Sequence, residues 1–214
     1  MDILFPFIAL IAGWVLGIFQ TFIVDKIKQR NVCAKFHQSL VSELRELQFQ
    51  MALVAFLSRI ETGRVDEKIT AIVKPIIHLY AKRTKDNEVR QLEELLNTPI
   101  SDANEVYAEI RYESRFSTGL KSYNMPFFES QLHSIGCLNS KQQSTCFKIL
   151  MYVKQYNQEN SRYWSFFEKT FNTTISGENH EFLRRNIRTC LMSMGNIAEG
   201  IITDTHQIIK GLEN

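Results

Sequence analysis

An uninterrupted apolar run near the start of the chain constrains its fold more than any other feature. Residues 3–24 contain no Asp, Glu, Lys, Arg or His. An α-helix rises about 1.5 Å per residue, so such a run covers the roughly 30 Å hydrocarbon core of a bilayer. Pro6 falls in the first turn of that helix, where a missing N–H costs little. The run predicts a transmembrane helix, with residues 1–25 as an anchor and residues 26–214 as a separate helical domain.

The charges that flank the run predict its orientation. Met1 and Asp2 precede it, whereas Lys26, Lys28 and Arg30 follow it closely. A secretory signal peptide would instead carry basic residues before the apolar stretch and a small-residue cleavage site after it. Positive flanks stay in the cytoplasm. We therefore expect a single pass through the inner (cell) membrane, with the N-terminus outside, residues 26–214 in the cytoplasm and the three basic side chains against lipid headgroups.

A stripe of small residues follows one face of the expected anchor. Ala9, Gly13, Gly17 and Thr21 recur every four residues, with a G-x-x-x-G at their centre. In lipid, small residues let two helix backbones approach closely, and packing then drives association. Gln20 could hydrogen-bond across such an oligomer. The stripe predicts self-association, and it leaves open whether Gln20 and Thr21 line a pore or only pack.

Residues 26–214 have the pattern of an all-helical domain. Apolar residues recur every three or four positions, which is typical of amphipathic helices, and strand patterns are nearly absent. Pro75 is expected to kink or divide the second helix. The fold class expected is all-α, a transmembrane helix that continues into a cytoplasmic up-and-down helical bundle. The expected helices cover residues 26–60, 65–84, 86–97, 101–115, 127–134, 139–171 and 178–211.

Composition and side-chain spacing exclude several classes of site. The formal net charge of +2 is too small to indicate a nucleic-acid-binding protein. None of the five histidines or four cysteines has metal-ligand spacing, so neither a metal nor a cofactor is expected. A disulfide would need an oxidising compartment, and the expected cytoplasmic location argues against one. Free, buried or half-buried thiols are therefore expected at Cys33, Cys137, Cys146 and Cys190.

Catalytic motifs are also missing from the sequence. It has no phosphate-binding loop, dinucleotide fingerprint or nucleophile elbow, which predicts a protein that is not an enzyme. HEPN ribonucleases carry Arg, four to six residues, then His, and Arg30 with His37 fits that spacing. The pair lies beside the expected anchor, whereas the family places its pair late in the bundle. An Arg near lipid phosphates and a His on a polar face is the simpler interpretation.

Two further clusters could contact a partner. Arg184, Arg185 and Arg188 form a basic patch on the last expected helix. A solvated helix face explains them most simply, and a phosphate or partner contact is the alternative. The aromatic run of residues 163–167 is interpreted as core or interface packing rather than as a base-stacking surface.

The layout, an apolar run at residues 3–24 and helices to the end, resembles small single-pass membrane proteins of prokaryotic anti-phage defence. It is similar to the membrane accessory proteins of RNA-targeting type VI CRISPR systems, in which a membrane helix precedes a HEPN-like bundle. The resemblance is one of architecture, and the late Arg–His pair is missing. It implies an oligomeric assembly that perturbs the envelope during infection, and it implies no site residues.

Three functions therefore remain in view. The first is a non-enzymatic, self-associating membrane effector or pore, whose partners are the lipid bilayer and copies of the same chain. The second is a membrane-tethered adaptor that recruits a cytoplasmic protein partner. The third is a HEPN-like ribonuclease at the membrane. The small-residue stripe and the missing catalytic motifs favour the first, and nucleic acid is not an expected partner.

Overall fold

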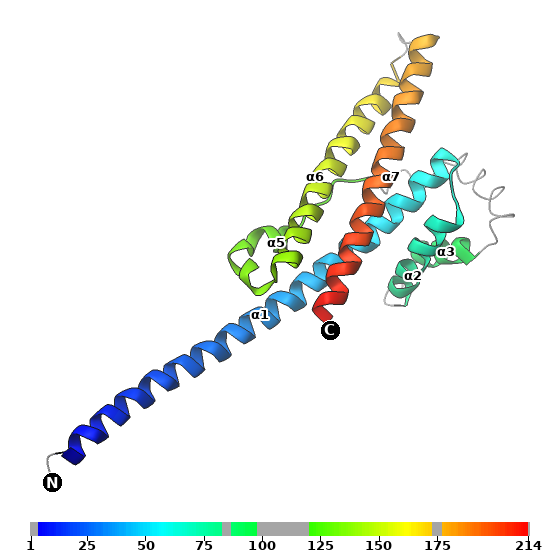
Figure 1. Ribbon diagram of the computed structural model, residues 1–214. Coiled ribbons are helices and arrows are strands. Elements are labelled where there is room, and N and C mark those ends of the chain that lie inside the picture. Colours follow the sequence, from blue (N-terminus) through cyan, green and yellow to red (C-terminus); the bar gives the residue numbers. More distant parts are fainter. Residues whose placement is uncertain (1–3, 83–86, 98–119, 173–176, 214) are drawn as a thin grey trace.

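The computed structural model describes residues 4–82, 87–97, 120–172 and 177–213, and its side chains are described from Gly13 onward, except at residues 15, 87, 88 and 91. These parts consist of helices joined by short turns and loops, without a strand, so the all-α prediction is confirmed. The helix expected at 101–115 lies outside the described residues. The elements are α1 (Leu4–Thr62), α2 (Glu67–Ala81), α3 (Asn87–Asn97), α5 (Pro126–Ser130), the 3-10 helix η2 (Leu132–Cys137), α6 (Ser140–Lys169) and α7 (Glu178–Glu213) (Figure 1).

Helix α1 is a single continuous helix of 59 residues. It contains both the apolar run and the expected first helix of the domain, and it projects far beyond the other elements at its N-terminal end (Figure 1). Gly63 ends it with a positive φ of 66°. The N–H groups of Gly63 and Arg64 bond to the carbonyls of Ile60 and Arg59, which closes the last turn in a Schellman motif. The helix end expected at Gly63 is confirmed.

The bundle is formed by the C-terminal half of α1 with α6 and α7. Helix α7 lies between the other two, and α2 packs against α1 with α3 beside it (Figure 1). The expected seam of α7 faces the core, where Met194 and Ile201 are fully buried. On α1, the first buried side chain is Phe36, so the core begins twelve residues after Val24 (36 minus 24).

Helices α1 and α7 cross most closely at Ser58 and Gly195. A Cβ atom added to Gly195 would lie 2.2 Å from Ser58 Oγ and 3.2 Å from Ser58 Cβ. Above the crossing, Arg59 of α1 bonds through Nε to Glu199 Oε1 at 3.1 Å and through Nη2 to Asn196 Oδ1 at 2.9 Å. These polar bonds fix the register of the two helices.

Local sequence signals explain where the other helices begin. Asn139 accepts a bond from the N–H of Gln142, whose side chain returns a bond to the Asn139 N–H, so a capping box starts α6. Asp66 caps α2, because its carboxylate accepts a bond from the N–H of Ile69. The expected division of α2 at Pro75 is wrong, because α2 continues through that residue as one helix.

Candidate functional site

The part of α1 that leaves the bundle is the most unusual surface of the molecule. Residues 13–32, called the free arm, have exposed side chains wherever these are described, and no other described element covers them (Figure 1). Trp14 and Leu16 are each 69% exposed, and Phe22 is 64% exposed. At 100° per residue, the apolar side chains of the free arm point in all directions. A helix that is apolar on every side suits an apolar environment better than a one-sided protein contact.

Small residues hollow one face of the free arm. Gly13, Gly17 and Thr21 line an open groove of about 740 Å³, with Trp14 and Phe22 on its rim. A Cβ added to Gly13 or to Gly17 would meet nothing within 4 Å. Thr21 donates its hydroxyl to the Gly17 carbonyl at 3.0 Å, so that polar group is satisfied within its own helix. The side chain of Ala9, also assigned to this stripe, lies outside the described residues.

Basic residues follow the apolar part of the free arm. Lys26, Lys28 and Arg30 are all exposed. Lys26 Nζ lies 5.9 Å from the centre of the Phe22 ring, so the ammonium group sits over the last aromatic side chain of the run. No helix in the described part of the chain is both long enough and apolar enough to cross a membrane.

A disulfide joins the base of the free arm to the bundle. Cys33 of α1 and Cys137 of η2 are bonded, with their Cα atoms 5.2 Å apart and a sequence separation of 104. The prediction of free thiols at these two positions is therefore wrong. Cys146 and Cys190 are free and buried, as expected. No local motif could have paired Cys33 with Cys137, because only the return of the chain to α1 brings them together.

Two other contacts hold the segment of α5 and η2 against α1 at this point. Nε2 of His37 lies 2.9 Å from the carbonyl oxygen of Cys137. Because a carbonyl oxygen only accepts, Nε2 is the protonated nitrogen. The Phe36 and Phe127 rings are 5.8 Å apart. We call Cys33, Phe36 and His37, with Phe127 and Cys137, the arm base.

Glu43 caps α5 from across the bundle. Its carboxylate oxygens accept the N–H groups of Phe127 at 2.7 Å and Phe128 at 2.9 Å. Burial raises the pKa of the Glu43 carboxyl above its usual value, and the two N–H bonds offset part of that rise. Glu43 thus supplies the capping bonds at the start of α5, because Met125 at the N-cap position makes no side-chain capping bond.

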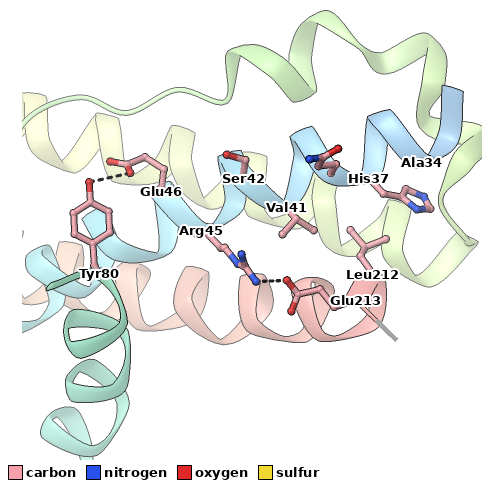
Figure 2. Close-up of a pocket in the computed structure, with 10 residues that line it drawn as sticks. Ala34, His37, Val41, Ser42, Arg45, Glu46, Tyr80, Leu212 and Glu213 are labelled. Atoms are coloured by element: carbon pink, nitrogen blue, oxygen red, sulfur yellow. Dashed lines mark hydrogen bonds and ion pairs between the residues drawn. The ribbon is translucent and has the colours of Figure 1, made fainter. Parts of the chain in front are cut away.

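A polar groove of about 710 Å³ runs along α1 between α2 and the end of α7. Figure 2 shows Arg45 paired with Glu213 across it, and Tyr80 bonded to Glu46. Glu46 also accepts a bond from Gln50 at 2.8 Å. Arg45 and Glu213 thus offset each other's charge, and Glu46 accepts hydrogen bonds from the neutral side chains of Tyr80 and Gln50.

The residues of the expected ribonuclease motif lie two helical turns apart on α1. Arg30 is exposed on the free arm, and His37 lies two helical turns further on with its ring bonded to the arm base. Among the described residues, no three His, Cys, Asp or Glu side chains gather closely enough to hold a metal ion.

The two other expected contact clusters lie at the opposite end of the bundle. Arg184 and Arg185 are exposed, whereas Arg188 donates through Nη2 to the Thr62 carbonyl at 2.9 Å. Arg188 therefore bonds the last turn of α1. The aromatic run packs as expected: Tyr163 is buried, and the half-buried Trp164 donates to the Leu120 carbonyl at 3.2 Å.

Comparison with known proteins adds no relative. No protein-family model, curated protein or solved structure matches the chain. The functional argument therefore depends on the free arm and the arm base.

Proposed function

We propose that this chain is a self-associating, non-enzymatic membrane protein that inserts residues 3–24 into a bilayer and holds its bundle on the cytoplasmic side. The observation that carries the proposal is the free arm, a helix with large apolar side chains on every side and no covering element. The apolar run begins at Ile3, ahead of the first described side chain, and the described residues supply its second half. Lys26, Lys28 and Arg30 are placed where headgroup phosphates would meet them.

The length of helix between the proposed span and the bundle supports the same arrangement. Twelve residues separate Val24 from Phe36, which corresponds to about 18 Å of helix. The headgroup region of one leaflet is roughly 5–8 Å deep. The arm is therefore long enough to carry the bundle clear of the headgroups while its apolar half remains in the bilayer.

Membrane insertion is tested by placing one charge in the proposed span. We expect Leu16→Asp to shift the full chain from the carbonate-resistant membrane fraction to the soluble fraction, since a charge near the centre of a span costs about 3 kcal/mol. Val32→Asp is the matched control, because Val32 is also an exposed apolar residue of the free arm but lies beyond the span. Extraction of the unmodified chain by carbonate would refute the anchor.

Self-association is supported by the groove at Gly13, Gly17 and Thr21, where a second helix could approach the backbone closely. We expect Gly13→Leu with Gly17→Leu to reduce the detergent-solubilised particle to a single chain, as measured by light scattering after size exclusion. The control is Phe19→Leu with Ile23→Leu, which preserves apolar character and touches no residue of the groove. An unmodified chain that is already monomeric, or a glycine variant of unchanged size, would remove this part of the proposal.

The adaptor alternative has less support than it had from the sequence. The adaptor depends on the seam of the last helix and on the aromatic residues near Trp164, and most of these side chains pack within the bundle. A phage-defence role stays a prediction of the resemblance alone.

A further inference from the structure

The four cysteines of the chain differ in their access to solvent. Cys146 and Cys190 are both buried, and burial raises the pKa of the Cys146 thiol to about 12. Desolvation is also the main reason that the pKa of Cys190 is raised. Thiols of this kind stay protonated, and the thiolate is the form that reacts. Cys33 and Cys137 are instead half-buried, so small thiols and disulfides can reach them.

The Cys33–Cys137 disulfide lies where the free arm meets the bundle. Cys33 directly follows the free arm and lies one turn before Phe36, the first buried residue among the described side chains of α1, so it lies outside the core. Cys137 ends η2 and is followed directly by the buried Leu138 and the capping box of α6. The disulfide thus attaches α1 to the rest of the bundle one helical turn closer to the proposed membrane than Phe36 does.

The remaining contacts of the arm base keep the two sulfur atoms near each other without the covalent bond. The His37 bond to the Cys137 carbonyl and the Phe36–Phe127 ring contact do not depend on the disulfide. Glu43 independently anchors α5, which directly precedes η2. A reduced pair would therefore remain positioned to close again.

We propose that Cys33 and Cys137 form a reversible thiol–disulfide latch that couples η2 to the free arm. The inference rests on the proposed function, because disulfides found in a cytoplasmic location are usually transient or redox-sensing. The oxidant is a low-molecular-weight disulfide such as oxidised glutathione. One cysteine thiolate attacks it, forms a mixed disulfide and releases one glutathione. The second cysteine thiolate then displaces the other glutathione, so two thiols are oxidised and one disulfide is reduced to two thiols.

The test counts free thiols of the full chain in cells. After an acid quench, each thiol is alkylated under denaturing conditions with a maleimide of fixed mass. We expect four tags in untreated cells, two tags after diamide, which oxidises the glutathione pool to its disulfide, and four again after the diamide is removed. Two tags under all conditions would mean a permanent disulfide, and four under all conditions would mean that the pair does not close. Either result overturns the latch.

Two variants assign the shift to this pair. Cys33→Ser leaves Cys137 without its partner, so it should carry three tags before diamide and two or three afterwards, because a mixed disulfide with glutathione can block Cys137 alone. Cys146→Ala should fall from three tags to one. A fall to one tag in the Cys33→Ser variant would locate the reactive pair elsewhere. Carbonate extraction of the same samples separates the two proposals. Two permanent tags in a membrane-bound chain would refute the cytoplasmic location as well as the latch, and an extracted chain would refute the anchor.

Hydrogen exchange on the purified chain tests whether closure holds the segment. Reduction should speed exchange of the η2 amides, including Ser134 and Leu138, which bond to carbonyls within the segment. The capped first turn of α6 should not change. Equal protection of η2 in both redox states would show that the disulfide forms without latching anything, and would overturn the proposal.

Discussion

At the scale of single residues, the crossing of α1 and α7 depends on the absence of one side chain. Gly195 is buried against Ser58, whose hydroxyl donates to the Ala55 carbonyl at 2.9 Å. Glycine in a helix interior is normally unfavourable relative to alanine. Here it leaves room for the Ser58 side chain, whose hydroxyl oxygen would lie only 2.2 Å from an added Cβ.

We expect Gly195→Ala to lower the free energy of unfolding by about 1–3 kcal/mol, since the new Cβ overpacks the crossing. Thermal unfolding of the full chain in one detergent, followed by circular dichroism, measures the change. Gly211→Ala in the same helix is the control, because its Cβ would make only an ordinary contact of 3.5 Å with Gln142 Nε2. Adding Ser58→Gly to Gly195→Ala should restore part of the loss, and no restoration would place the strain elsewhere.

Glu43 predicts a pH dependence of stability. The pKa of its carboxyl is raised in the folded chain above the ordinary 4.5, chiefly by burial. The folded state therefore holds the proton more tightly than the unfolded state, and the stability gained from this group is greatest below pH 4.5 and lost as the pH rises through the folded pKa. The difference in unfolding free energy, unmodified chain minus Glu43→Gln, should fall between pH 4 and pH 7. Glu168→Gln, at an exposed position of α6, should show no such fall.

At the scale of elements, helix ends are held by side chains that come from other helices. Glu43 of α1 caps α5, and Arg188 of α7 bonds the Thr62 carbonyl at the end of α1. A cation near a helix C-terminus also interacts favourably with the helix dipole. All three arginines of the basic cluster of α7 are exposed, and Arg188 among them bonds the end of α1.

We expect Arg188→Ala to destabilise the chain by about 0.5–1 kcal/mol and to speed hydrogen exchange in the last turn of α1. Arg185→Ala removes an exposed charge from the same helix and should leave that turn unchanged. Equal effects of the two variants would contradict the capping role of Arg188.

At the scale of the whole molecule, the disulfide closes a loop of 104 residues. A cross-link of this kind stabilises mainly by limiting the unfolded chain, typically by about 2–4 kcal/mol. Cys33→Ser should be less stable than the oxidised unmodified chain by that amount. The two should unfold alike once a reductant is added. A difference that survives reduction would mean that serine itself perturbs the arm base.

Local chemistry made much of the fold predictable from the sequence. Three features follow from local sequence patterns. They are the Asn139 cap of α6, the end of α1 at Gly63 and the apolar seam of α7. The division of α2 expected at Pro75 was wrong, since the helix continues through that residue, and packing of α2 against α1 can outweigh one missing hydrogen bond. The arm base could not be predicted, since Cys33 and Cys137 meet through the path of the intervening chain and not through any local pattern.

The continuity of α1 makes it a lever. From Val24, where the proposed span ends, to Thr62, where the helix ends, lies about 57 Å of unbroken helix. A change of only about 10° in the tilt of the span would sweep the far end of the bundle sideways by about 10 Å, and tilts of transmembrane helices vary over a wider range than that. A change in bilayer thickness or curvature that tilts the span would thus displace the far end of α1, without any hinge in the helix.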